Sequence, residues 1–418
     1  MALPPEQHPG RRDEHTAQTP LRLHLACRVI DNFGDAGASW RLARQLAAEH
    51  GLAVTLLIDR PEVLARLVPD LELAHRDACA PGEFRIRRWP REAAGTTARA
   101  ELADTALPDV LVCAYGCDPP TALRERLAGA PARPLWIELD YLSAESWVAD
   151  FHALPSFKPA DGARAWRYFP GFAPGTGGLP REPSLLAARR AFERGDSAQR
   201  WWRARELPDG PGLRLSIFCY PEAPLEGLLD ELAGADAPSI AVVPAPVASA
   251  QVDAWVATHG TRASGTALRP SYPRWQAGAL TLTRPPLLPI DDYDHLLWSC
   301  DLNLVRGEDS WIRALWAGRP FVWQPYRQQG QAHEAKREAF LRWQRDSLGA
   351  LDTAQAAAMA DLEALSRVWC EGEPPATAWR RVRAGLPLLG GCFTSLATRA
   401  AGQDDLATQL VRFCRSKL

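Results

Sequence analysis

The stretch LRLHLACRVIDNFGDAGASWRLARQLA, residues 21–47, decides the fold. Its first ten residues predict a buried strand, DNFGDAG predicts a glycine-bearing loop, and the remainder predicts an amphipathic helix that ends near residue 48. The same unit recurs downstream, where strand-like runs at 53–59, 109–115 and 134–142 alternate with helical runs. Repeated βα units predict a mostly parallel, doubly wound α/β sheet.

A second series of βα units follows a Pro/Gly cluster. An Arg/Trp-rich helical stretch (184–206) leads into LPDGPG (207–212), which is the best linker candidate. Beyond it, the strand-like runs are 213–220, 239–246, 279–288, 301–306 and 320–326, and the chain from about residue 331 is almost wholly helical.

These boundaries predict two Rossmann-like domains. We expect a disordered tail at 1–20, an N-terminal domain at 21–208, a second domain at 209–385, and C-terminal helices at 386–418 that pack back across the cleft. Ligands bind at the carboxyl ends of doubly wound strands, and here the two sets of ends would face each other. That architecture suits a nucleotide-sugar transferase of the GT-B type.

Composition narrows the class of protein. The chain has 418 residues, a net charge of −2, 46% hydrophobic and 23% charged residues, so a globular protein is expected and a strongly basic nucleic-acid binder is not. No run approaches the ~18 apolar residues of a membrane helix. The nine cysteines lie mostly in apolar runs, which is typical of buried thiols in the cytoplasm. Only three of the 48 basic residues are lysines, a bias that we attribute to a GC-rich genome.

Common cofactor and catalytic motifs are missing. DNFGDAG does not match G-x-G-x-x-G, no lysine follows a glycine as a Walker A loop requires, and His333-Glu334 lacks the second histidine of a zinc protease. We therefore expect no resident cofactor and no metal. The acidic run Asp291-Asp292-Tyr293-Asp294 is better explained by N-capping and helix-dipole complementation than by metal binding.

Two segments at strand ends carry candidate chemistry. Asp31-Asn32-Phe33-Gly34-Asp35 places two carboxylates around a turn, although both residues could instead be turn and helix caps. Arg306-Gly307-Glu308-Asp309-Ser310 precedes a helix whose free N–H groups suit a diphosphate, although Asp309 and Ser310 could instead be ordinary caps.

These segments resemble the EarP family of protein-arginine rhamnosyltransferases, which act on translation elongation factor P. The resemblance rests on CRVIDNFGDAGASWRLARQLA (27–47), WIELDYLSAESWV (136–148), FPGF with GTGGL (169–179), DYDHLLWSCDLNLVRGEDSWIRALWAGRPFVWQPY (292–326) and QxxAH (329–333). It implies a metal-independent, inverting GT-B enzyme in which the first domain binds the acceptor. The second domain would bind the donor, dTDP-β-L-rhamnose, and neither nucleic acid nor membrane would be a partner.

The resemblance also assigns roles to residues. It makes Asp35 the general base, Asp31 a second essential carboxylate and Glu308 the third catalytic acid. It places Asn32, Phe33 and Gly34 in the donor site, Phe218 against the thymine and Tyr220 on a phosphate. The residues that would hold the diphosphate and sugar are Arg306, Gly307, Asp309 and Ser310.

One position departs from the family pattern. The family has an aromatic-x-Pro-Gln run where this chain has Leu287-Leu288-Pro289-Ile290, so it lacks an amide and one stacking ring. We expect altered donor affinity or base selectivity, with Pro289 and the backbone groups beside it left to serve the donor.

Paired acids suit an arginine acceptor. The guanidinium stays protonated, so a carboxylate must orient it and accept its proton. Two alternatives remain open from the sequence: a GT-B enzyme with a small-molecule acceptor, and a non-catalytic protein that binds a nucleotide sugar or a translation factor.

Overall fold

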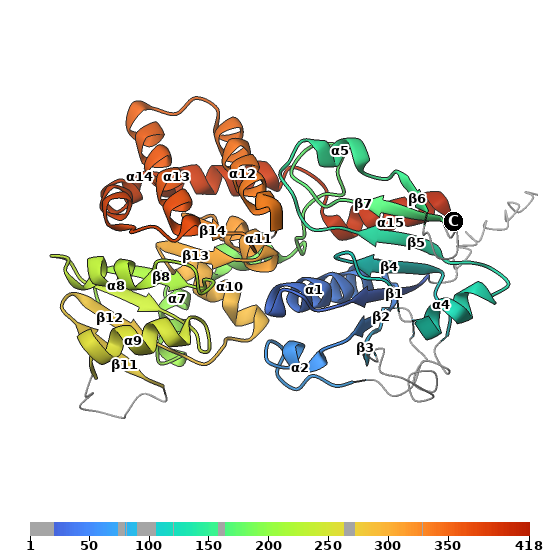
Figure 1. The fold of residues 1–418 in the computed structure, drawn as a ribbon, viewed down its shortest axis with the longest axis horizontal. Coiled ribbons are helices and arrows are strands. Elements are labelled where there is room, and N and C mark those ends of the chain that lie inside the picture. Colours follow the sequence, from blue (N-terminus) through green and yellow to red (C-terminus); the bar gives the residue numbers. More distant parts are fainter. Residues whose placement is uncertain are drawn as a thin grey trace, which may run out of the picture.

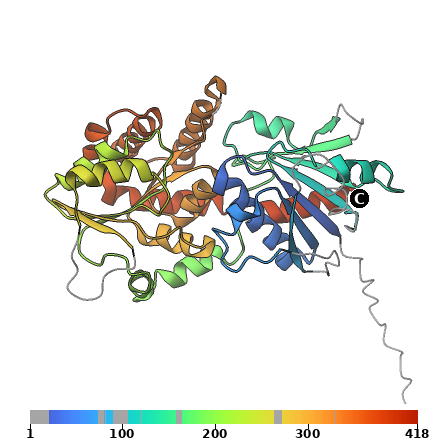
Figure 2. The ribbon, with the colours of Figure 1, turned by 60° about the horizontal axis from the view of Figure 1, so that its bottom comes forward.

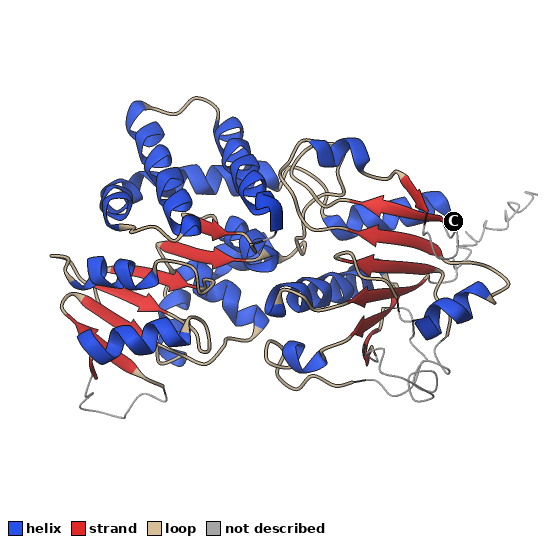
Figure 3. Ribbon diagram, viewed as in Figure 1, coloured by secondary structure: helices blue, strands red, loops and turns tan. Residues whose placement is uncertain are grey.

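The computed structural model describes residues 21–73, 80, 82–89, 106–119, 121–157, 164–262, 272–327 and 329–418. The predicted tail at 1–20 lies outside this part of the chain. Two sheets stand side by side, each covered by helices on both faces (Figures 1 and 3). The predicted α/β fold with two Rossmann-like domains is confirmed.

The first sheet has the strand order β3-β2-β1-β4-β5-β7-β6, and only β6 runs antiparallel to its neighbour. Its elements are β1 (Arg22–Cys27), α1 (Asn32–His50), β2 (Ala53–Ile58), α2 (Pro61–Leu64), β3 (Phe84–Arg88), β4 (Val110–Ala114), α4 (Thr121–Ala128), β5 (Leu135–Leu139), α5 (Trp147–Phe151), β6 (Pro155–Phe157) and β7 (Arg164–Tyr168). In β1, Leu23, Leu25 and Cys27 are fully buried, as expected for a central strand covered on both faces.

The second sheet has the order β10-β11-β12-β9-β8-β13-β14, with antiparallel pairing confined to β10, β11 and β12. Its elements are β8 (Leu213–Ile217), α8 (Leu225–Ala233), β9 (Ser239–Val242), α9 (Ser249–His259), β10 (Thr261–Arg262), β11 (Arg274–Ala277), β12 (Leu280–Thr283), α10 (Ile290–Ser299), β13 (Leu302–Arg306), α11 (Glu308–Ala317) and β14 (Phe321–Gln324). Helix α11 is held against β14 by Trp311, whose ring stacks on Trp323 at 3.7 Å between centroids.

The remaining helices connect or cover the two sheets. They are α6 (Leu185–Phe192), α7 (Ser197–Ala204), the short η1 (Gln329–Gln331), α12 (Ala332–Leu348), α13 (Thr353–Glu371), α14 (Ala376–Ala400) and α15 (Leu406–Lys417). The predicted single helical stretch at 184–206 is wrong, because Gly195 adopts φ +62° and separates α6 from α7. Both helices contact α10, although they precede the predicted domain boundary at 208, which stays a prediction.

The C-terminal helix returns to the first sheet. In α15, the ring of Phe413 lies 5.7 Å from that of Trp166 and 5.5 Å from that of Tyr168, whereas α14 packs on α13 and α8 in the other half. Figures 1 and 2 show α15 in red beside the first sheet while the preceding helices cover the second. No helix in the described ranges is both long and apolar enough to cross a membrane.

Candidate active site

Two helix N-termini meet between the domains, because the carboxyl ends of β1 and β13 face each other. Asp31 is the N-cap of α1 and Gly307 is the N-cap of α11. Gly307 has φ +63°, and a Cβ there would lie 2.6 Å from Asp31 Oδ2. Only glycine satisfies both conditions, so this residue lets the two helices approach.

Asp31 reaches across the domain boundary. The Tyr220 hydroxyl donates to Asp31 Oδ2 at 2.7 Å, and the Asp31 side chain makes no capping bond on its own helix. The reading of Asp31 as a turn cap is therefore wrong. The expected glycine-bearing loop is also wrong, since α1 begins at Asn32 and Gly34 lies in its first turn.

Asp35 is held firmly and buried. Its Oδ2 accepts the backbone N–H groups of Ile30 at 2.7 Å and of Asp31 at 2.8 Å, and its carboxylate also bonds the Tyr141 side chain. Asp35 lies inside α1, and both backbone donors precede the helix, so the interpretation of Asp35 as a helix cap is wrong. Tyr141 belongs to the segment that follows β5, so Asp35 has partners from two parts of the first domain.

Glu308 opens α11 and turns back toward the first domain. Its Oε2 accepts the Leu142 backbone N–H at 2.8 Å, and its Oε1 lies 3.8 Å from Lys336 Nζ of α12. Asp31, Asp35 and Glu308 are therefore brought together as three carboxylates at one junction, from both domains.

Burial perturbs all three acids. Desolvation raises the pKa of Asp31 to about 6, against the Tyr220 hydrogen bond and the charge of Arg306. Desolvation likewise raises the pKa of Asp35, against the two backbone donors. The pKa of Glu308 rises to about 8, chiefly by burial, with Lys336 opposing the rise and the Asp35 charge adding to it. Carboxyl groups whose pKa burial raises above the ordinary range suit proton transfer.

One cavity gathers most of the predicted donor residues. It encloses about 500 Å³, its open mouth included, which is within the ~300–1,000 Å³ of small-molecule sites. Eight of its twelve lining residues were predicted from the sequence: Asp31, Phe33, Gly34, Phe218, Ile290, Arg306, Asp309 and Ser310. The rings of Phe33 and Phe218 lie 6.5 Å apart across the domain boundary.

Arg306 is the cation of this cavity. Its guanidinium carbon lies 4.9 Å from the centroid of Phe218 and 4.4 Å from that of Tyr220. A guanidinium held against aromatic rings beside a helix N-terminus has the charge and fixed position that suit an anion.

The remaining predicted residues lie at or beyond the margin of the cavity. Tyr220 and Gly307 do not line the cavity, but both lie against Asp31, which does. Pro289 is the N-cap of α10 and does not line the cavity. For Asn32 only the backbone, in the first turn of α1, is described.

Of the backbone groups beside Pro289, those of Ile290 are already bonded within the protein. The Ile290 N–H donates to the Leu67 carbonyl at 2.9 Å, and its carbonyl accepts from Arg41 Nη2 at 2.8 Å. Leu287 and the Ile290 side chain do line the cavity, so the departure from the family pattern gives this wall an apolar surface.

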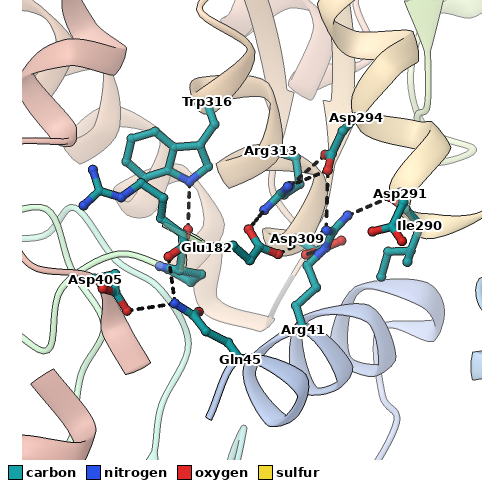
Figure 4. A network of polar contacts seen from close by, with 12 residues as sticks. Arg41, Gln45, Glu182, Ile290, Asp291, Asp294, Asp309, Arg313, Trp316 and Asp405 are labelled. Atoms are coloured by element: carbon teal, nitrogen blue, oxygen red, sulfur yellow. Dashed lines mark hydrogen bonds and ion pairs between the residues drawn. The ribbon is translucent and has the colours of Figure 1, made fainter. Parts of the chain in front are cut away.

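A buried network of charges ties the domains together behind the cavity (Figure 4). Arg41 of α1 lies 3.3 Å from Asp309 and 3.5 Å from Asp294, while Arg313 of α11 bonds both Asp294 and Glu182. Burial alone would raise the pKa of Glu182, but Arg313 and Arg41 outweigh it and lower that pKa to about 2. Asp309, predicted on the diphosphate and sugar, thus faces Arg41 as well as the cavity.

The acidic run at the start of α10 forms ion pairs and hydrogen bonds with other helices and does not cap its own helix. Pro289 is the N-cap, and no side chain caps the helix. Asp291 pairs with Arg44, Asp292 accepts from Trp201 Nε1 at 3.0 Å, and Asp294 pairs with Arg313. The N-capping interpretation is wrong, although Asp291 and Asp292 do lie in the first turn, as dipole complementation requires.

Sequence reasoning missed Tyr141 and Lys336. Tyr141 follows β5, where parallel strands present ligand-binding residues, and this position was the available signal. Lys336 is one of three lysines in an arginine-rich chain, a rarity that could have singled it out. Both touch the acids through tertiary contacts that no local pattern encodes.

Comparisons with known proteins agree with this geometry. The family described as "Elongation-Factor P (EF-P) rhamnosyltransferase EarP" matches residues 23–415. Protein-arginine rhamnosyltransferases from Pseudomonas putida and Pseudomonas aeruginosa are 40% and 39% identical, over 94% and 93% of this chain and 98% and 97% of theirs. A solved structure described as the structural basis for EarP-mediated arginine glycosylation of translation elongation factor EF-P is 32% identical, with a TM-score of 0.63, and covers 95% of this chain and 100% of its own.

Proposed function

This chain belongs to the EarP family of elongation factor P rhamnosyltransferases, and on that premise we propose that it transfers L-rhamnose from dTDP-β-L-rhamnose to an arginine of elongation factor P. The anomeric centre is inverted in the transfer. The reaction takes place in the cytoplasm, and the eight cysteines that the structure describes, all free and buried, suit a reducing compartment.

The observation that carries the proposal is the meeting of acids and cation at one domain junction. Asp31, from the first domain, bonds Tyr220 of the second at 2.7 Å and lines the same cavity as Arg306. Carboxylates suit a cationic acceptor and a developing oxocarbenium charge, while a fixed guanidinium suits a departing diphosphate.

The donor occupies the cavity between the two domains, which Phe218 and Arg306 of the second domain line together with Phe33 of the first. Its thymine stacks on Phe218, and its diphosphate lies between Arg306 and the N-terminus of α11, where Ser310 lines the cavity and no side chain caps the first turn. These positive groups stabilise the charge that builds on the leaving dTDP, so that the proposed transfer runs without a metal.

The acceptor approaches from the first domain. A guanidinium with a pKa above about 12 is a poor nucleophile, so Asp35 takes one of its protons as the nitrogen attacks C1 of the sugar. The new N–C1 bond forms as the bond from C1 to the diphosphate oxygen breaks, on the opposite face, and this displacement inverts the centre. Asp31, together with Glu308 in its ionised form, stabilises the positive charge shared by the acceptor and the sugar ring.

Each of the two domains binds chiefly one of the two substrates. The first domain, predicted at 21–208, supplies Asp31, Asp35 and Tyr141 to the acceptor. The second, predicted at 209–385, supplies most of the donor site, which Phe33 and Gly34 of the first domain complete. The buried pairs of Arg41 with Asp294 and Asp309 hold the two surfaces in register.

Intact-mass measurement of elongation factor P tests this proposal. The factor is incubated with the enzyme and dTDP-β-L-rhamnose, and a matched sample contains a variant of the factor in which the modified arginine is lysine. A gain of one deoxyhexose on the natural factor alone is expected. Transfer to small molecules without transfer to the factor would contradict the acceptor, and donor binding without any transfer would contradict catalysis by these residues.

A further inference from the structure

Lys336 of α12 reaches the acceptor side of the junction from outside both sheets. Its Nζ lies 3.8 Å from Glu308 Oε1 and 5.2 Å from the centroid of the Tyr141 ring. The side chains of Lys336 and Glu308 are only 19% and 23% exposed, so this is a shielded contact and not a surface pair. The mechanism above gives this ammonium no task.

The groups around the Lys336 ammonium make a seat for a cation. Tyr141 stacks on Tyr115 with 4.8 Å between ring centroids and an interplanar angle of 17°, which fixes its ring. Glu308 lies beside the ring, Asp35 bonds the Tyr141 side chain, and the charge of Lys336 also acts on the neighbouring Asp140. We call Glu308, Tyr141, Asp35 and Asp140 the acceptor seat.

The acceptor seat has the chemistry that guanidinium groups select. A planar guanidinium stacks on an aromatic face and bonds carboxylates at its edge, and the acceptor seat offers both. Asp35, the proposed base, is part of it, so a guanidinium bound there would present its proton to the correct group.

We propose that in the free enzyme the Lys336 ammonium occupies the place of the acceptor guanidinium, and that the acceptor displaces it. The inference rests on the proposed function and names the subsite that accepts the arginine. Lys336 is then a positioning residue that keeps the acceptor seat assembled until the protein acceptor arrives.

A lysine suits this task better than an arginine. A protonated ammonium has no lone pair with which to attack the sugar, whereas a guanidinium beside Asp35 would itself resemble the acceptor. The ammonium is also a point charge on a flexible stem, so it can swing out of the acceptor seat when displaced. In a chain with three lysines among 48 basic residues, one stands at this position.

Calorimetric titration with methylguanidinium chloride tests the inference without the donor. The titration is done at constant ionic strength and at pH 9, above the Glu308 pKa of about 8. Lys336→Met removes the competing cation, so methylguanidinium should bind about fivefold more tightly than to the wild type. The KM for elongation factor P should fall by a similar factor.

Lys417→Met is the matched control. Lys417 also lies over an aromatic ring, 4.1 Å from the centroid of Trp166, but belongs to α15 far along the first sheet. The same substitution there should leave both quantities unchanged. Equal or weaker methylguanidinium binding by a folded Lys336→Met protein would overturn the inference.

A replacement variant and a comparison with transfer activity separate the possible outcomes of this test. If Lys336→Met does not fold, Lys336→Gln replaces it, with the same expected tightening. Because the binding assay needs no turnover, a wild-type enzyme that binds methylguanidinium but modifies no factor would count against the proposed function alone. A wild type that modifies the factor, with no tightening in either Lys336 variant, would count against the acceptor seat alone.

Discussion

The Tyr220 hydroxyl donates a hydrogen bond to Asp31 Oδ2 at 2.7 Å, and the two residues are 189 positions apart in the chain. This bond joins the carboxyl edge of one sheet to that of the other. It also opposes the effect of burial, which raises the pKa of Asp31 to about 6. The contact therefore couples the assembly of the domains to the charge of an acid in the cleft.

Tyr220→Phe should destabilise the protein more at pH 8 than at pH 5. The bond is to a carboxylate at pH 8 and to a largely neutral acid at pH 5, and a hydrogen bond to a charged group contributes ~1.5–3 kcal/mol. Urea denaturation at both pH values measures the difference. Tyr272→Phe is the control, since the Tyr272 hydroxyl bonds a backbone carbonyl and its loss should not depend on pH. Equal losses at the two pH values for Tyr220→Phe would contradict the assignment.

Arg306→Ala should abolish measurable binding of dTDP-β-L-rhamnose in calorimetry while the fold persists. The guanidinium is the cation that lines the donor cavity. Arg214→Ala is a matched control, because Arg214 also lies over an aromatic ring, at 4.6 Å from the centroid of Trp202, but does not line the cavity. Donor affinity that survives in Arg306→Ala would refute the placement of the diphosphate.

Ile290→Gln should tighten donor binding or sharpen the preference for thymidine over uridine. The Ile290 side chain lines the cavity, and its backbone groups are already bonded to the first domain, so only a side-chain amide can add a contact. One hydrogen bond contributes about 0.5–1.5 kcal/mol. Competition titrations with the two nucleotides measure it, and Ile290→Leu controls for the change of packing. Affinities equal to those of Ile290→Leu would mean that this wall does not read the base.

Glu308→Gln should flatten the fall of stability with rising pH. A carboxyl whose pKa is raised to about 8 by burial binds its proton more tightly in the folded state. The protonated Glu308 therefore adds its full share to the free energy of unfolding below the ordinary pKa of 4.5. This share is lost as the pH rises through 8. Melting temperatures at pH 5 and pH 9 measure the slope, which glutamine should reduce because it resembles the protonated acid. Parallel slopes would show that Glu308 titrates as an exposed residue does.

The sequence predicted the parts of the fold that local pattern encodes. The central strand β1 and the helix α1 follow from an apolar run and a 3.6-residue period. Strands β3 (FRIRR) and β7 (RAWRY) were missed because arginines alternate with their few apolar residues. Their place in the sheet comes from pairing with β2 and β5.

Some residues of the candidate site could also be predicted from local sequence, and others could not. Asp31, Asp35 and the residues at 306–310 stand at strand ends and could be named from sequence. The contacts of Tyr141 with Asp35 and of Lys336 with Glu308 join distant segments, so only the packed structure reveals them. The use of Asp291, Asp292 and Asp294 as partners of arginines and a tryptophan was hidden for the same reason.

The central claim is that Asp35 removes the proton from the acceptor guanidinium. Asp35→Asn tests it most directly, because asparagine keeps one oxygen for the Ile30 and Asp31 N–H groups but cannot act as a base. The control is Asp59→Asn, since Asp59 also accepts a backbone N–H, from Val29 at 2.9 Å, without joining the three acids.

The measurement is the rate of rhamnose transfer to elongation factor P per folded enzyme, with donor affinity determined separately. For Asp35→Asn we expect a fall of at least ~10²-fold in rate with donor affinity nearly unchanged, and for Asp59→Asn a rate close to that of the wild type. Near-normal turnover by folded Asp35→Asn would contradict the account.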